Sequence, residues 1–190
     1  INDVPILSDI NDQRMDEDGI FTYDLIATDV DDVDVSYSAT VDGNASVDVT
    51  GSTLTITPDL HYNGDIAVDV TVSDGELTDS QSITVTVNAV NDAPVLAAVG
   101  DRSIDEDTDL NLLLSSTDIE GDVLSYSITG GNQITSTLAG NDLTFTPDQD
   151  FNGSEIFTVT VNDGHLQDFE TFTVTVNAVN DAPILATVSD

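Results

Sequence analysis

Cysteine, tryptophan and lysine are absent from this chain of 190 residues, and its only arginines are Arg14 and Arg102. Without cysteine the chain can form neither a disulfide nor a cysteine-based metal site or nucleophile. Phosphate contacts depend on Lys and Arg, and anionic lipids attract the same residues. We therefore expect no nucleic acid and no anionic membrane among the partners. No apolar run approaches the roughly 18 residues of a membrane span, and no signal-peptide pattern is present.

Acidic residues dominate what is present, since 37 Asp and Glu give a formal net charge of −35. So acidic a chain could be disordered, but apolar residues alternate regularly along it, and this alternation indicates β-strands. Asp far outnumbers Glu. Asp is favoured in turns, and its short carboxylate is a ligand that hard cations such as Ca²⁺ prefer.

The sequence repeats itself without a gap. The phrase "VTVNAVNDAPVLA" begins at 85 and returns as "VTVNAVNDAPILA" at 174, a distance of 89 residues, and the chain opens with "INDVPIL". A fixed period of this kind is the mark of a repeat array. We predict repeat 1 at 1–90, repeat 2 at 91–179 and the start of a third repeat at 180–190, as part of a longer array.

Each copy contains short alternating segments rich in Val, Thr and Ile, separated by Asp, Gly and Asn. In copy 1 these segments lie at 4–10, 20–28, 35–41, 45–50, 53–58, 66–73 and 80–90. Seven antiparallel strands in about 90 residues fit a two-sheet Greek-key sandwich. The predicted fold class is all-β, with two tandem seven-stranded immunoglobulin/cadherin-like β-sandwiches.

Strand direction predicts that the acids converge on the linker at 88–94. The first and fifth loops of copy 1 and the second and sixth loops of copy 2 should face it. The candidate ligands there are Asp16, Glu17, Asp18, Asp59, Asn88, Asn91, Asp92, Asp118, Glu120 and Asp163. The equivalent positions at the outer ends of the two copies are Asp29, Asp31, Asp74 and Glu106.

Carboxylates packed this closely repel one another unless a cation lies among them. Six to eight oxygen ligands in flexible loops are the set that Ca²⁺ takes, whereas Mg²⁺ prefers a smaller octahedral shell. Zinc and copper favour His or Cys. The sequence therefore predicts Ca²⁺ at the linker. The alternative is that these acids are solvated turn residues, which is the usual role of a single Asp.

The loops and linker resemble those of cadherin repeats. The similar positions are a Glu after the first strand (Glu17, Glu106), a D-x-D pair (Asp29 with Asp31, Asp118 with Glu120) and a later Asp (Asp74, Asp163). The linker departs from the cadherin pattern at Asn88, and "TPDLHYNG" stands in place of L-D-R-E.

A closer resemblance is to the cadherin-like tandem repeats of giant bacterial surface proteins, including RTX-type adhesins. It is carried by the run from "TPD" through "NG" and "DG" to "VNDAP", and it covers the whole chain. The resemblance implies a secreted, calcium-stabilised array at the bacterial cell surface, in proteins of biofilm and adhesion.

We therefore predict extender repeats of an extracellular adhesin, made rigid by calcium, with no enzymatic activity. No catalytic constellation stands out, and His61 and His165 occupy non-equivalent places in the two copies. The expected partners are adjacent repeats of the same chain, with host or biofilm surface ligands bound through other domains. The alternatives are a carbohydrate-binding or homophilic adhesion module, and an accessory domain of a large secreted enzyme.

Overall fold

The computed structural model describes residues 2–31 and 34–183. The chain divides into two compact units, Ile1–Val90 (unit 1) and Asn91–Asp190 (unit 2), and each is treated by itself. Residues 184–190, where most of the predicted third repeat falls, lie outside the described part. All regular elements of the described residues are strands, which confirms the all-β prediction. No described helix has the length and apolar character needed to cross a membrane.

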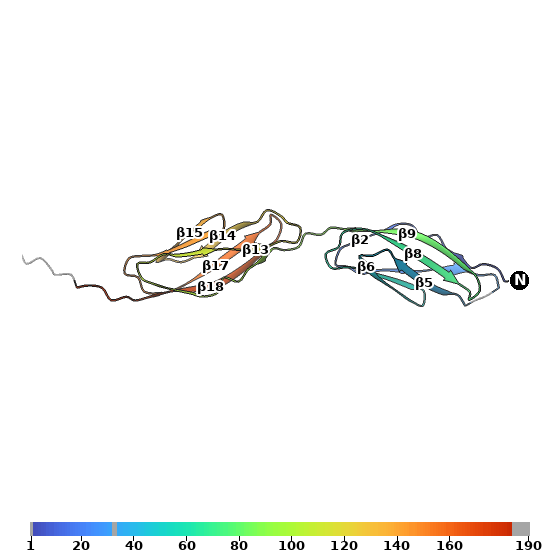
Figure 1. The fold of residues 1–190 in the computed structure, drawn as a ribbon, viewed down its shortest axis with the longest axis horizontal. Helices are drawn as coiled ribbons and strands as arrows, with labels where there is room; N and C mark the ends of the chain where they lie inside the picture. Colours follow the sequence, from blue (N-terminus) through green and yellow to red (C-terminus); the bar gives the residue numbers. More distant parts are fainter. Residues whose placement is uncertain (1, 32–33, 184–190) are drawn as a thin grey trace, which may run out of the picture. The chain divides into compact units, whose positions relative to one another are not determined.

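Unit 1 is a sandwich of two main sheets (Figure 1). Its strands are β1 (Ile6–Leu7), β2 (Gln13–Asp16), β3 (Phe21–Asp24), β4 (Ala27–Thr28), β5 (Ser36–Val41), β6 (Ala45–Thr50), β7 (Thr53–Pro58), β8 (Gly64–Ser73) and β9 (Thr78–Asn88). One sheet has the order β2-β9-β8-β5 and the other β3-β7-β6, while β1 pairs with β4.

Unit 2 repeats this topology. Its strands are β10 (Val95–Leu96), β11 (Arg102–Asp105), β12 (Leu110–Leu113), β13 (Ser116–Thr117), β14 (Ser125–Gly130), β15 (Ile134–Ala139), β16 (Asp142–Pro147), β17 (Gly153–Asn162) and β18 (Gln167–Asn177). The sheets have the orders β11-β18-β17-β14 and β12-β16-β15, with β10 on β13.

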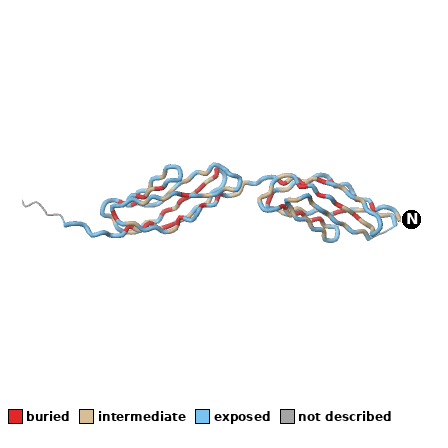
Figure 2. Tube along the Cα trace, viewed as in Figure 1, coloured by how far each residue is buried: buried red, intermediate tan, exposed pale blue. Residues whose placement is uncertain are grey.

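Each unit has its own hydrophobic core between its two sheets (Figure 2). Alternation produces it, because successive side chains of a strand point to opposite faces. In β7 the buried residues are Leu54, Ile56 and Pro58, and in β8 every second residue from Ile66 is buried. Unit 2 fills its core with larger rings, and the centroids of Phe145 and Phe157 lie 4.7 Å apart.

The prediction for the start of each sandwich was wrong in one respect. It made residues 4–10 one antiparallel strand and placed Asp16 in the following loop. The structure has a short β1 and then β2, which ends at Asp16 and runs parallel to β9, with Gln13 opposite Val85. Unit 2 has the same parallel pair in β11 and β18. The first strand thus passes from a two-stranded sheet to the four-stranded sheet, where it lies beside the last strand of its unit.

Candidate metal sites

Acidic side chains gather at both ends of each unit. The N-terminal pole is the end of a unit at which the chain enters that unit. The C-terminal pole is the end at which the chain leaves it. The N-terminal pole of unit 2 contains Asn91, Asp92, Asp118, Glu120, Asp122 and Asp163. Its C-terminal pole contains Glu106, Asp107, Asp150 and Asp181.

Asp163, in the turn between β17 and β18, anchors the N-terminal pole of unit 2. Its side chain is only 8% exposed. Oδ2 accepts a hydrogen bond from Asn91 Nδ2 at 2.9 Å, and Oδ1 accepts the amides of His165 and Leu166, both at 2.6 Å. The bond from Asn91, followed by those two amides, lowers the pKa of Asp163. A linker asparagine is thereby fixed to a carboxylate that stays ionised.

Unit 1 builds the same arrangement around Asp74. Its Oδ1 accepts the amides of Glu76 and Leu77, both at 2.7 Å, and its Oδ2 accepts Asn2 Nδ2 at 2.9 Å. The amide of Leu77, and then that of Glu76, lowers the pKa of Asp74. Because both units make these bonds in the same register, the N-terminal pole is a property of the repeat.

Asp118 contributes two oxygens with different surroundings to the N-terminal pole of unit 2. Its Oδ1 accepts the amide of Asp122 at 2.9 Å, but Oδ2 is buried and has no hydrogen-bond partner among the described residues. Nearby, Glu120 Oε2 accepts the amide of Asp92 at 3.2 Å. Buried polar atoms normally have partners, and a bound ion is one of the usual reasons for an exception.

The predicted D-x-D pair of unit 1 lies at the corresponding place. Asp29 Oδ1 accepts the amide of Asp31 at 2.8 Å, and Asp31 Oδ2 accepts the amide of Asp3 at 2.8 Å. The second carboxylate of the pair therefore holds the entering chain in both units, as Asp31 in unit 1 and as Glu120 in unit 2.

A buried glutamate holds the departing chain at each C-terminal pole. Glu106 is 7% exposed, and its Oε1 accepts the amide of Val179 at 2.6 Å. Glu17 is 5% exposed and accepts the amide of Val90 at the same distance. Asn63 Nδ2 donates to the other oxygen of Glu17 at 3.4 Å. The two predicted glutamates thus fix the first part of each linker directly.

Three aspartates converge at the C-terminal pole of unit 2. One carboxylate oxygen each from Asp107, Asp150 and Asp181 lies within 4.8 Å of the other two. Partial desolvation, followed by repulsion from Asp181, Asp107 and Glu106, raises the pKa of Asp150. Neither Arg14 nor Arg102 pairs with an acid within the described residues. This group has the features of a cation site: close oxygens, repulsion and no balancing side chain.

In unit 1 a histidine occupies the position of Asp150. The amide of His61 donates to Asp18 Oδ1 at 2.9 Å, and His61 Nδ1 lies 3.3 Å from Asp18 Oδ2. The structure shows that His61 adopts φ +57°, as Asp150 does at +58°, so the two residues occupy one kind of turn.

The remaining candidates make contacts within unit 1. Asn88 Nδ2 donates to Asp16 Oδ1 at 3.1 Å across the parallel pair β2–β9. Asp59 uses its main chain, since its amide donates to Asn44 O at 2.8 Å and its carbonyl accepts the amide of Tyr62 at 3.0 Å. These contacts connect strands and turns.

Sequence reasoning missed Asp107 and Asp150 as candidate ligands. Both adopt positive φ values, +59° and +58°, which Asp tolerates better than most residues. The 89-residue repeat offered a signal, because it aligns Asp107 with Asp18 and Asp150 with His61. A carboxylate exchanged for an imidazole at equivalent positions is a change between two kinds of metal ligand.

The oxygens at these poles fit calcium. They come from carboxylates, with linker asparagines beside them, and oxygen ligands of this type are the ones that Ca²⁺ takes. In unit 2 the residues that would hold the ion are Asp118, Glu120 and Asp163 at one pole and Asp107, Asp150 and Asp181 at the other. At the N-terminal pole Asp163 is already bonded to Asn91, so Asp118 Oδ2 is the oxygen most ready to accept an ion.

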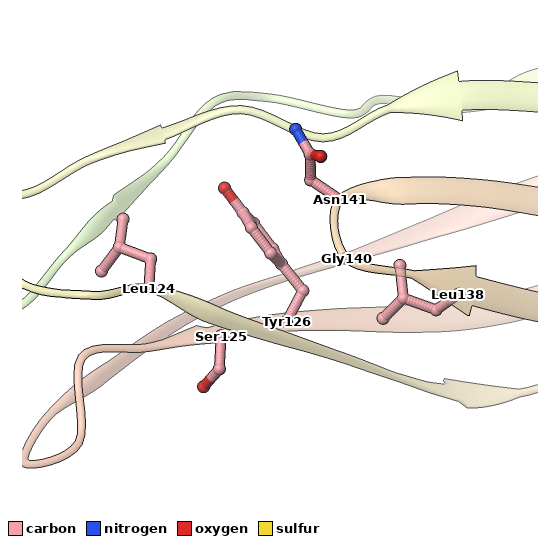
Figure 3. A pocket seen from close by; sticks show the side chains of 6 residues that line it. All are labelled: Leu124, Ser125, Tyr126, Leu138, Gly140 and Asn141. Carbon is pink, nitrogen blue, oxygen red and sulfur yellow. The ribbon is translucent and has the colours of Figure 1, made fainter.

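A pocket of about 520 Å³ lies at the edge of unit 2 between the start of β14 and the β15–β16 turn (Figure 3). It is lined by Leu124, Ser125, Tyr126, Leu138, Gly140 and Asn141. Tyr126 is its only aromatic lining residue, and its hydroxyl bonds to Ser116 Oγ at 2.5 Å. Asn141 Nδ2 donates to Leu114 O at 3.0 Å. These two polar groups are engaged within the unit.

Both units match one protein-family model. Residues 2–86 and residues 91–177 each match the family described as bacterial Ig domain. Chitinase A of Pseudoalteromonas piscicida is 34% identical to this chain over 112 residues, which are 57% of this chain. The match spans only 14% of the chitinase.

Among solved structures, human protocadherin-24 EC1-2 aligns with 95% of this chain and 100% of its own, at a TM-score of 0.51 and 16% identity. This likeness supports the fold. An endo-fucoidan hydrolase of glycoside hydrolase family 107 aligns with 93% of this chain and 29% of its own, at a TM-score of 0.41 and 19% identity.

Proposed function

This chain belongs to the bacterial Ig domain family, and from that premise we propose that its repeats are calcium-rigidified extenders of an extracellular adhesin at the bacterial cell surface. The observation that carries the proposal is the convergence of Asp107, Asp150 and Asp181, with no arginine paired to them. The role is structural: the repeats hold an adhesive region away from the cell and carry out no reaction.

The repeat supports a joint at each linker. Unit 2 holds Asn91 and Asp92 at its N-terminal pole and Asp181 at its C-terminal pole. Since Asp92 and Asp181 occupy the same position of the phrase "VNDAP", one phrase is bound by both kinds of pole. We infer that each linker is held by the repeat before it and by the repeat after it, with Ca²⁺ completing both contacts.

Calcium should therefore stabilise the fold, and thermal melts of the 190-residue chain in millimolar Ca²⁺ and in EGTA test this. Binding to the folded state alone adds about 2.7 kcal/mol per site at a hundredfold excess over Kd. For a domain of this size we expect the melting temperature to rise by about 10–20 °C. Equal melting temperatures in Ca²⁺ and EGTA would refute the proposal.

The control separates ion binding from charge screening. A chain of net charge −35 gains stability from any salt that screens its repulsion. Melts in NaCl and in MgCl₂ at matched ionic strength should therefore give a smaller shift than CaCl₂. If all three salts act alike, the carboxylates are screened and bind no ion.

The similarity to part of chitinase A favours a second candidate, an accessory module of a secreted carbohydrate-active enzyme. Sedimentation of the chain with insoluble chitin distinguishes the two. The extender role predicts that the chain stays in the supernatant. Retention on chitin that is lost in Tyr126→Ala, which alters the pocket of Figure 3, would support the accessory module instead.

A further inference from the structure

The first and last strands of each unit are joined by a row of side-chain bridges that extends beyond their backbone pairing. In unit 2 the parallel ladder covers only Arg102–Asp105 against Val174–Asn177. The preceding segment passes from the two-stranded β10–β13 sheet to the four-stranded sheet, because β10 pairs with β13 while β11 pairs with β18. A crossing segment cannot form a backbone ladder with β18, so its amides need other acceptors.

Carboxylates from β18 supply those acceptors. Asp168 Oδ2 accepts the amide of Leu96 at 2.9 Å. The two oxygens of Glu170 accept the amides of Val99 and Gly100 at 2.6 and 2.9 Å. In the opposite direction, Asp101 Oδ1 accepts the amide of Thr173 at 2.7 Å. Hydrogen bonds to an ionised acceptor are stronger than neutral ones.

The row continues past the far end of the ladder. Asn177 Nδ2 donates to Ser103 Oγ at 3.0 Å, and Asn177 O accepts the amide of Glu106 at 2.9 Å. Glu106 then accepts the amide of Val179. The two terminal strands are thus connected from Leu96 to Glu106.

Unit 1 repeats the row in register. Asp79 accepts the amide of Leu7 at 2.9 Å, Gln81 accepts that of Ile10 at 2.6 Å, and Asp12 accepts that of Thr84 at 2.8 Å. Gln81 occupies the position that Glu170 has in unit 2. A side-chain amide oxygen can therefore accept this hydrogen bond in place of a carboxylate oxygen. The recurrence at the same spacing argues against accidental surface contacts.

The direction of the two terminal strands determines how this row of bridges responds to force. The first and last strands run parallel, so the chain enters the first strand at one end and leaves the last strand at the other. A pull on the two ends therefore slides one strand along the other. The hydrogen bonds that connect the two strands are perpendicular to the applied force and bear it together. If the two strands were pulled from the same end, their hydrogen bonds would break one at a time.

We propose that this row, the terminal-strand clamp, makes each repeat a force-bearing element. In unit 2 it consists of the β11–β18 pair and the bridges of Asp101, Asp168, Glu170, Asn177 and Glu106. The inference rests on the proposed extender role only for the origin of the force. It requires no metal, because every bond in the clamp is a direct hydrogen bond between protein atoms.

The test is single-molecule pulling of the whole chain by its two ends in EGTA. The natural chain should give two unfolding events, one for each unit. In Asp168→Ala plus Glu170→Ala, the unit that unfolds in one of the two events should unfold about tenfold or more faster at a given force, since the variant removes three hydrogen bonds to charged groups. The other event should not change, and Glu170→Gln should retain most of the resistance, as Gln81 does in unit 1.

The matched control is Glu155→Ala. Glu155 also accepts three backbone amides, those of Asn132, Gln133 and Ile134, but these lie in a turn and do not join the terminal strands. It should lower the melting temperature and leave both force events unchanged. If the double variant does not fold, Asp101→Ala should weaken the same event.

Two results would overturn the clamp: unchanged force events in the folded clamp variants, or an equal loss of force in Glu155→Ala. Because calcium is absent throughout, either result would leave the calcium proposal untouched. Equal melts in Ca²⁺ and EGTA would likewise leave the clamp untouched.

Discussion

Asp150 is the residue whose environment works most clearly against its charge. Partial desolvation, and then the negative charges of Asp181, Asp107 and Glu106, raise its pKa above the ordinary value for Asp. A raised carboxyl pKa means that the folded state binds the proton more tightly than the unfolded state does. The ionised carboxylate of Asp150 therefore lowers the free energy of unfolding at pH values above its folded pKa. This destabilisation disappears as the pH falls through the folded pKa toward the unfolded pKa.

Asp150→Asn should consequently have opposite effects in the two ionic conditions. In EGTA at neutral pH it removes repulsion, and unit 2 should melt at a higher temperature than the natural chain. In Ca²⁺ it removes a ligand, and the calcium-induced shift should become smaller. Calorimetry of both proteins in both conditions measures this.

The control for this change is Asp142→Asn, an exposed acid of unit 2 at the start of β16. It alters the net charge equally and should leave the calcium shift intact. Should Asp150→Asn lower the melting temperature in EGTA, the carboxylate would be stabilising the turn and not opposing its neighbours.

Asp163 and Asp74 titrate in the other direction. Their hydrogen bonds lower their pKa values, so the stability that they contribute is present above the unfolded pKa and is lost as the pH falls through the folded pKa. Acidification thus loosens the N-terminal poles, while at the C-terminal pole of unit 2 it removes the repulsion around Asp150.

At the scale of elements, the two turns that flank β15 make different demands on glycine. Gly131 has φ +78°, and a Cβ there would lie 2.5 Å from Ile134 O and 2.6 Å from the Phe157 ring. Gly140 has φ +65°, but a Cβ there would meet no atom within 4 Å. The turn at Gly131 requires glycine both for its positive φ and because a side chain has no room there. The turn at Gly140 requires glycine only for its positive φ.

Gly131→Ala should therefore destabilise unit 2 more than Gly140→Ala. The left-handed conformation costs an alanine about 1–2 kcal/mol at either position. Overpacking against the core adds about 1–3 kcal/mol at position 131. Urea denaturation in EGTA should show the larger loss for Gly131→Ala, and equal losses would mean that β14 and the Phe157 ring move apart without cost.

At the scale of the whole molecule, the two units have separate hydrophobic cores and are joined by the linker at 88–94. Among the described residues, the unit 1 core ends at Val87 and the unit 2 core begins at Leu96. Domains joined by a short linker move relative to one another unless a large hydrophobic interface holds them. The proposed ions would be what restricts that motion.

Small-angle scattering tests this expectation. With Ca²⁺ the maximum dimension should increase and vary less than in EGTA. In Asp118→Ala plus Asp163→Ala this difference should shrink, because the N-terminal pole of unit 2 loses its ligands while both cores stay intact.

The matched control is Asp48→Ala plus Asp69→Ala, two exposed acids within strands β6 and β8 of unit 1. It removes the same charge and should keep the calcium-dependent elongation. Elongation that persists undiminished in the double variant at Asp118 and Asp163 would mean that these two residues do not hold the ion at the joint.

Much of the fold could be predicted because its signals are local. Alternation of Val and Thr with buried partners specifies a strand from its own residues, as in β7 and β8. A period of 89 residues specifies the repeat and, with it, the acids that recur in register. Glu17 and Glu106 could likewise be placed at one pole, since each follows the first strand of its copy.

Only the tertiary structure decided which of these acids meet. The parallel pairing of β2 with β9, the bridges from Glu170 to Val99 and Gly100, and the convergence of Asp107, Asp150 and Asp181 all join residues far apart in the chain. Local periodicity does not encode such contacts, because they depend on where the first strand leaves one sheet for the other. That crossing places the last strand beside the first. The carboxylates of β18 then accept hydrogen bonds from backbone amides that have no partner in the β11–β18 ladder.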